Sequence, residues 1–157
     1  MTLQVRTIPD RWRALGLAAN FVAKHEPFSR FPGGDLIRTL HAQVQRGHYL
    51  FALDTSNDPA RVMGYFGWSL YHHAAAERFA ATGVPPAEEL ASGGDVAWLV
   101  TSVADSRGAF FALAKAARAL YPTHRIMGIR HKRDGRRITF DQWRKRIADK
   151  ETKMSAS

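Results

Sequence analysis

Histidine and carboxylate side chains are the residues of this chain whose types and spacing suggest chemistry. His72 and His73 are adjacent, and Glu77 follows His73 by four residues, which would place the last two on one side of a helix. Metal ligands use this spacing, but it supplies only two of the ligands that a zinc site needs. The sequence has no cysteine, which excludes disulfides, a thiol nucleophile and thiolate metal ligands. We therefore expect no metal site, and a solvated helix face here.

A second candidate is the turn at the start of a predicted helix. A buried strand over 96–103 is followed by Arg107-Gly108 and a helix over 108–120. Unpaired backbone N–H groups at a helix N-terminus favour anions. The arrangement resembles the acetyltransferase (GNAT) fold, in which such a turn receives a pantetheine or pyrophosphate group. Phe110 and Phe111 stand where that fold usually has small residues, and an ordinary helix start is the alternative interpretation.

The charge of the chain is strongly positive, with 23 Lys and Arg against 14 Asp and Glu and a net charge of +9. Ten basic and three acidic residues lie between Arg125 and Lys150, so +7 of the charge belongs to that stretch. Such a field attracts nucleic acid, an acidic protein or a phosphate-bearing group. A solvated basic face is the alternative. Nucleic acid fits less well, because Phe140 and Trp143 are the only aromatic residues in the stretch.

Hydrophobic periodicity and turn residues predict the element order α-α-β-β-α-β-α-β-β-α. The expected helices cover 11–24, 35–45, 72–81, 108–120 and 140–150. The expected strands cover 48–53, 62–71, 96–103, 125–131 and 136–139, with Asp134-Gly135 as a hairpin turn. Asp10 and Asp35 are the expected N-caps of the first two helices. In the first helix the expected buried stripe is Trp12, Leu15, Ala19 and Val22.

A chain of 157 residues, 45% of them hydrophobic, suits one domain that folds without disulfides or metal. We expect an α+β fold: a GNAT-like single domain over 1–150 with a mixed, mostly antiparallel sheet and packed helices, followed by a frayed tail over 151–157. No apolar stretch reaches the ~18 residues of a membrane span, and the run over 14–19 is too short for a signal peptide. These features predict a cytoplasmic protein without a membrane partner.

Three stretches together resemble the RTX toxin-activating (haemolysin-activating) lysine acyltransferases. The first, FPGGDLIRTLHAQVQRGHYLFALD, is similar to that family's segment from a Trp-Pro to an Asn-Gln-Tyr. The second, VMGYFGWSLYHHAAAERF, is similar to its Ala-Tyr-Cys-x-Trp strand, with Tyr65 and Trp68 matching. The third, SGGDVAWLVTSVA, is similar to its Gly-Asp-x-x-Trp segment, with Gly94, Asp95 and Trp98 matching. A weaker match, LYPTHRIMGIR, follows, and the resemblance covers about residues 20–135.

The resemblance implies a protein-lysine fatty acyltransferase whose donor is acyl-carrier protein. Acyl-carrier protein would be a co-substrate and a partner, the acceptor would be a protein lysine, and no cofactor would be tightly bound. Carrier proteins are acidic, so the basic charge of this chain would speed their encounter. The oligomeric state stays open, a homodimer included.

Two sets of residues are expected to contact the donor. Arg107 and Gly108, at the start of the predicted helix, are the candidates for the phosphopantetheine arm, with an ordinary helix start as the alternative. Arg118, Arg125 and Arg130 are the candidates for contact with the carrier, and a solvated surface arginine is the alternative for each. Trp68 and Trp98 are expected either in the core or as walls of an acyl pocket, which needs an apolar lining.

Both catalytic residues that the resemblance implies are displaced in this sequence. Phe28 stands at the position of the family's histidine, and His25 lies three residues earlier; Thr101 stands at the position of its aspartate, and Asp105 lies four residues later. A lysine amine, with a reference pKa near ~10.4, must lose a proton before it attacks a thioester. A histidine oriented by a carboxylate suits that task. We predict His25 as the base with Asp105 or Asp95 as its partner, and Thr101 as a further catalytic candidate.

Three alternatives remain open at this point. One is a relative that binds a carrier or an acyl group without transferring it, or that uses another base. Another is a nucleic-acid-binding module that uses the basic C-terminal stretch. The last is an acetyltransferase that depends on coenzyme A.

Overall fold

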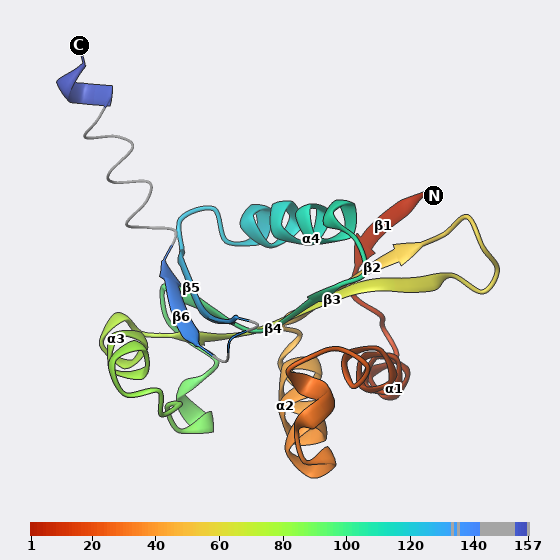
Figure 1. Cartoon of the computed structure of the whole chain (residues 1–157), viewed down its shortest axis with the longest axis horizontal. Helices are drawn as coiled ribbons and strands as arrows, with labels where there is room; N and C mark the ends of the chain where they lie inside the picture. The colour runs from red at the N-terminus through yellow and green to blue at the C-terminus, as the bar shows by residue number, and fades with distance from the viewer. Residues whose placement is uncertain (133, 135, 142–152, 157) are drawn as a thin grey trace. The chain divides into compact units, whose positions relative to one another are not determined.

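The computed structural model describes residues 1–132, 134, 136–141 and 153–156. The main elements in chain order are β1 (Leu3–Arg6), α1 (Arg11–Val22), α2 (Gly33–Arg46), β2 (Tyr49–Asp54), β3 (Arg61–Tyr71), α3 (His73–Thr82), β4 (Val96–Ala104), α4 (Arg107–Leu120), β5 (Arg125–His131) and β6 (Arg137–Asp141). Figure 1 shows these elements. The chain divides into two compact units. Unit 1 comprises residues 1–68 and 100–122, and unit 2 comprises residues 69–99 and 123–157.

The strands are hydrogen-bonded in the order β1-β2-β3-β4-β5-β6. Within unit 1, β1 pairs with β2 and β2 with β3, both antiparallel. Within unit 2, β5 and β6 form an antiparallel hairpin, and Val96–Leu99 of β4 pair in parallel with Arg125–Gly128 of β5. The predicted α+β fold with a mixed, mostly antiparallel sheet is confirmed. β1 was not predicted, because four residues with two exposed side chains give too short a pattern to recognise.

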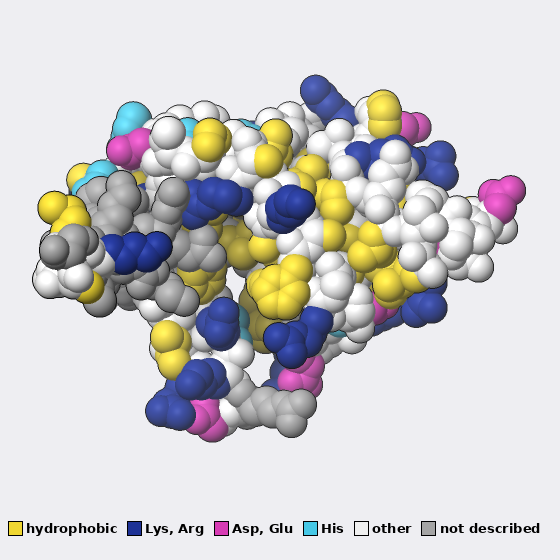
Figure 2. Space-filling model, turned by 90° about the horizontal axis from the view of Figure 1, so that it is seen from above, with side chains coloured by type: hydrophobic (Ala, Val, Ile, Leu, Met, Phe, Trp, Pro, Cys, Tyr) yellow, Lys and Arg dark blue, Asp and Glu magenta, His cyan; other side chains and the backbone are white. Residues whose placement is uncertain are grey.

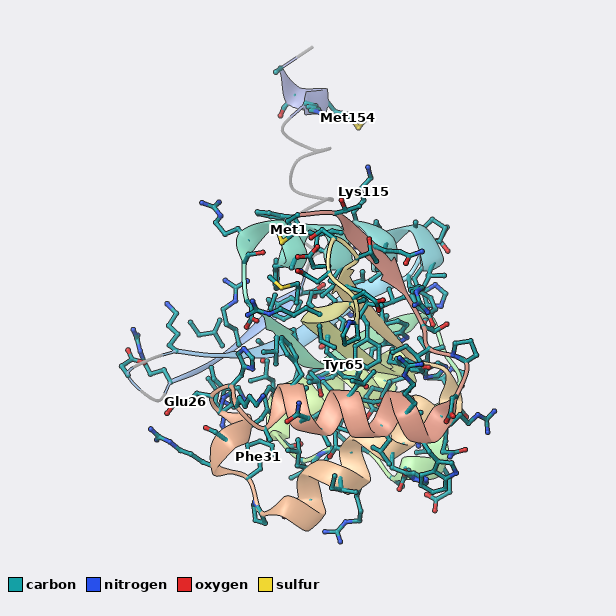
Figure 3. All side chains as sticks on the ribbon, turned by 90° about the vertical axis from the view of Figure 1, so that its right-hand side faces the viewer. Met1, Glu26, Phe31, Tyr65, Lys115 and Met154 are labelled. Carbon is teal, nitrogen blue, oxygen red and sulfur yellow. The ribbon has the colours of Figure 1, made fainter. Side chains whose placement is uncertain are left out.

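In unit 1, α1 and α2 lie on one face of the sheet and α4 lies on the other (Figure 1). Between these two helices and the sheet lies a hydrophobic core that includes Leu40, Phe51 and Tyr65. On the other side, α4 approaches β3 closely at Gly64, where an added Cβ would lie 2.7 Å from Leu113 Cδ1. Figure 3 shows α1 lying across the sheet below Tyr65.

Asp10 caps α1 as predicted, since its carboxylate accepts hydrogen bonds from the backbone N–H groups of Trp12 and Arg13. The predicted buried stripe of α1 is wrong at Trp12; Val22 is buried, and Leu15 and Ala19 are partly buried and pack against the core. The buried residues are Ala14, Ala18, Phe21 and Val22, and Trp12 is 73% exposed. Small alanine side chains face the core because they let the helix lie close to it, whereas the Trp12 ring lies on the surface, 6.1 Å from the His41 ring.

α2 begins earlier than predicted. Its N-cap is Pro32 and its first residue is Gly33, so Asp35 does not cap the helix but lies in the first turn, where it forms an ion pair with Arg38. A carboxylate in the first turn is favourable because it faces the positive end of the helix dipole. Gly47 ends the helix with a φ of 70°, a conformation that glycine adopts readily.

Unit 2 is built around an aromatic cluster and one buried arginine. Trp98 stacks on Phe79 of α3 at 4.3 Å between ring centroids. β5 and β6 pair antiparallel as predicted, and Gly135 of the predicted turn lies outside the described residues. A basic helix is predicted over 140–150, but Phe140 and Asp141 are the last residues of β6. Residues 142–150 lie outside the described part of the chain.

None of the helices in the described part of the chain combines the length and the apolar character that crossing a membrane would require.

Candidate active site

The structure brings His25 and Asp105 together in unit 1. Their side chains join through His25 Nε2 and Asp105 Oδ1, 2.8 Å apart. They are 26% and 28% exposed, so solvent and a substrate can reach both. The predicted contact is therefore present, with Asp105 and not Asp95 as the partner. Asp95 belongs to unit 2.

Two chain segments position this pair. His25 follows the C-terminus of α1, where its backbone N–H donates to the Val22 carbonyl and its ring packs 4.6 Å from the Phe21 ring. Glu26, labelled in Figure 3, is its neighbour in the chain. Asp105 follows β4, and its backbone N–H donates to the Met63 carbonyl of β3. The pair thus depends on the end of α1 meeting the end of β4.

The contacts of His25 distinguish its two ring nitrogens. Nδ1 lies 2.8 Å from the Phe21 carbonyl oxygen, which can only accept, so Nδ1–H is the donor in this contact. Nε2 faces the Asp105 carboxylate, so it is the ring nitrogen at which a proton can be exchanged in the cleft. Arg61 lies 3.7 Å from the other carboxylate oxygen, Oδ2, and can hold Asp105.

The pair forms part of the wall of an open cleft of about 460 Å³ in unit 1. The cleft is lined by Leu17, Asn20, Phe21, Lys24 and His25 of the α1 segment, Ala60, Arg61 and Val62 at the start of β3, and Asp105. Lys24, Ala60 and Arg61 were not among the predicted site residues. No sequence signal could have identified them, because they gather only through the packing of α1 against β3.

Thr101 lies apart from this pair, in the interior. Its side chain is fully buried, and its hydroxyl accepts a hydrogen bond from Gln43 Nε2 at 3.1 Å. Tyr65 donates in turn to Gln43 Oε1 at 2.9 Å. The same burial raises the pKa of Tyr65 far above its usual value. Gln43, Tyr65 and Thr101 therefore form a buried polar network that joins α2 to the sheet.

Replacing Thr101 by valine is expected to lower the free energy of unfolding by about 1–3 kcal/mol, because it leaves the buried Gln43 amide without this acceptor. Urea titration of both proteins measures the change. Thr123→Val is the matched control, since Thr123 is exposed, and it should change stability by no more than about 0.5 kcal/mol. Equal stability of Thr101→Val and the wild type would contradict the structural role.

The two predicted pocket tryptophans lie in different units, and both are in a core. Trp68, in unit 1, is 3% exposed and donates from Nε1 to the Tyr121 hydroxyl at 2.9 Å. Trp98, in unit 2, is 2% exposed. Their surroundings match the alternative that the sequence left open, which is packing in the core.

The arginines predicted to contact a donor are placed in three different ways. Arg107 and Gly108 are exposed in the first turn of α4, directly after Asp105 and the N-cap Ser106. Arg118 donates to the Tyr121 carbonyl at 3.2 Å, where it caps the end of the same helix. Arg130, in unit 2, lies 6.0 Å from the Phe140 ring.

Arg125 is wrongly predicted as a surface contact. It is 6% exposed and forms ion pairs with Asp141 and with Glu77, the latter at 2.7 Å. Hydrogen bonding to Asp141 is the main cause that raises the pKa of Arg125 above its usual value. Its guanidinium thus links α3, β5 and β6 within unit 2.

His73 and Glu77, four residues apart on α3, face each other as their spacing indicates, with His73 Nε2 3.7 Å from Glu77 Oε1. Glu77 also forms an ion pair with Arg125. Among the residues that the structure describes, no three His, Asp or Glu side chains are grouped so that they could hold a metal ion.

Comparisons with known proteins give similar folds but no family. No model of a known protein family matches the chain, and no curated protein matches it. Membership of the toxin-activating family is therefore not shown.

Solved structures of acetyltransferases are similar to this chain. An N-acetyltransferase from Staphylococcus aureus Mu50 is 12% identical with a TM-score of 0.45, and the match covers 80% of each chain. A probable acetyltransferase is 14% identical with a TM-score of 0.45, over 82% of this chain and 78% of that one. The PaiA N-acetyltransferase from Thermoplasma acidophilum, in complex with coenzyme A, is 11% identical with a TM-score of 0.45, over 85% of this chain and 82% of that one. At such low identity, the likeness concerns the fold alone.

Proposed function

We propose that this chain is an acyltransferase that moves an acyl group from acyl-carrier protein to a lysine side chain of a protein substrate. The observation that carries the proposal is the His25–Asp105 pair, which forms part of the wall of an open cleft of about 460 Å³. A histidine joined to a carboxylate at a surface that a substrate can reach is the arrangement that general base catalysis needs.

The chemistry requires that the amine lose a proton and that a thiol leave. The acceptor ammonium enters the cleft and donates to the Asp105 carboxylate, while one of its protons passes to His25 Nε2. The free amine then attacks the thioester carbonyl, so that a C–N bond forms and the C–S bond breaks. The leaving thiolate takes a proton from His25 Nε2, and the amide nitrogen loses its second proton to solvent.

The start of α4 supports a donor that carries a phosphate. Ser106 Oγ accepts from the Ala109 backbone N–H, and the preceding residue in the chain is Asp105. The N-terminal turn presents backbone N–H groups and the exposed Arg107 to an anion. A Cβ on Gly108 would approach nothing nearer than Ser106 Oγ, at 3.9 Å, so there is room beside the backbone at this turn. Figure 2 shows Lys and Arg side chains spread among hydrophobic ones on one face, which suits an acidic carrier.

The test supplies the protein with the same long-chain acyl group on acyl-carrier protein and on coenzyme A. Lysine-containing candidate proteins serve as acceptors, intact mass spectrometry detects an acylated acceptor, and a thiol reagent measures the released thiol. We expect acylated lysine with the carrier-bound donor. Transfer from coenzyme A alone would overturn the proposed donor. Absence of both acylated lysine and released thiol with either donor would overturn the proposed function.

A further inference from the structure

A second cleft adjoins the cleft of the His25–Asp105 pair. It has a volume of about 410 Å³ and also belongs to unit 1. It is lined by Arg6, Ile8, Pro9, Asp10, Arg13, Leu17, Leu53, Pro59, Ala60 and Val62. Leu17, Ala60 and Val62 line both clefts, so the two meet along these three side chains.

The walls of the second cleft are suited to hydrocarbon. Seven of its ten lining residues are aliphatic or proline, and the others are Arg6, Asp10 and Arg13. The carboxylate of Asp10 is engaged by the backbone of α1, where it accepts from Trp12 N and Arg13 N at 3.0 Å each. A long apolar chain placed here would be removed from water over much of its length, which is favourable in proportion to the area buried.

Of the three shared residues, Ala60 has the smallest side chain. Leu17 and Val62 are partly buried and pack against the hydrophobic core of unit 1. Ala60 is exposed and stands between Pro59 and Arg61, just before β3. A larger side chain at position 60 would therefore reduce the space where the two clefts adjoin, and Ala60 is not part of the hydrophobic core of unit 1.

We propose that the acyl chain of the donor runs from the His25–Asp105 pair past Ala60 into the second cleft, and that Ala60 thereby determines how long an acyl chain the site accepts. This inference rests on the proposed function for the identity of the ligand. The location of the chain and the role of Ala60 rest on the two clefts and their shared residues.

Binding of the fluorescent long-chain fatty acid cis-parinaric acid tests the groove without requiring catalysis. The variant is Ala60→Trp, whose ring would occupy the space where the two clefts adjoin, and the matched control is Ala119→Trp, at an exposed alanine of α4. Each methylene kept out of an apolar site costs about fourfold in affinity. We therefore expect Ala60→Trp to weaken binding of the probe by more than about tenfold, since several methylenes are excluded, and Ala119→Trp to bind it as the wild type does.

Competition and transfer experiments complete the test. Long-chain fatty acids should displace the probe from the wild type, and acetate should not. In the transfer assay, Ala60→Trp should reduce the transfer of long-chain acyl groups more strongly than the transfer of short ones. Equal binding of the probe by Ala60→Trp and the wild type, or no binding by the wild type, would overturn the inference. Probe binding that Ala60→Trp abolishes, together with no transfer by the wild type, would overturn the proposed function and leave the hydrocarbon groove in place.

Discussion

Replacing His25 by alanine is expected to lower the rate of acyl transfer by a factor of about 10²–10⁴, the usual contribution of a positioned general base. The variant should remain folded, because the His25 side chain is partly exposed and lies at the end of α1 rather than in its core-facing stripe. Release of thiol from acyl-carrier protein gives the rate. Circular dichroism and the melting temperature report whether the fold is kept.

A double-mutant cycle separates a catalytic pair from two independent contacts. Asp105→Asn should lower the rate as well, and the double variant should be little slower than His25→Ala, because residues that act as a unit are not additive. His72→Ala is the matched control: His72 is exposed and makes no capping hydrogen bond through its side chain. It should keep the wild-type rate. A His25→Ala rate equal to that of the wild type would show that another residue is the base.

The sequence predicts His25 as one member of this pair and leaves two aspartates, Asp105 and Asp95, as candidates for the other. His25 and Asp105 are 80 residues apart, and Asp95 was an equal candidate on residue type. The choice depends on where α1 ends relative to the end of β4, which is a property of tertiary packing. Arg61 illustrates the same limit. It reaches Asp105 only because β3 begins beside the C-terminal end of β4.

The helices and central strands could be predicted because their patterns are long. The predicted strand over 62–71 and helix over 108–120 each differ from β3 and α4 by one residue. The buried face of α1 could not be predicted in the same way. Two fully buried alanines, Ala14 and Ala18, lie on the side that faces the core, and a hydrophobic pattern does not show whether an alanine is buried. Arg125 gave no sign of burial, because its partners Glu77 and Asp141 come from distant parts of the sequence.

The Gly94→Ala variant is expected to lose about 2–6 kcal/mol of stability, the sum of two separate costs. Gly94 has a φ of 131°, which a residue with a Cβ adopts only with strain of about 1–3 kcal/mol. An added Cβ would also lie 2.1 Å from the carbonyl carbon and oxygen of Tyr71 and 2.4 Å from His72 N. These are backbone atoms at the end of β3, which cannot turn aside as a side chain does, so further overpacking of roughly 1–3 kcal/mol follows.

Gly93→Ala is the matched control in the neighbouring residue. Nothing lies within 4 Å of a Cβ built on Gly93, and Gly93 is not among the glycines with positive φ. For a chain of this size, the loss in Gly94→Ala corresponds to a fall in melting temperature of about 4–24 °C, whereas Gly93→Ala should melt close to the wild type. Equal melting temperatures of the two variants would contradict the close approach of Gly94 to the end of β3. The glycine that matches the Gly-Asp-x-x-Trp pattern is thus required here by backbone packing in unit 2, whether or not the His25–Asp105 pair transfers an acyl group.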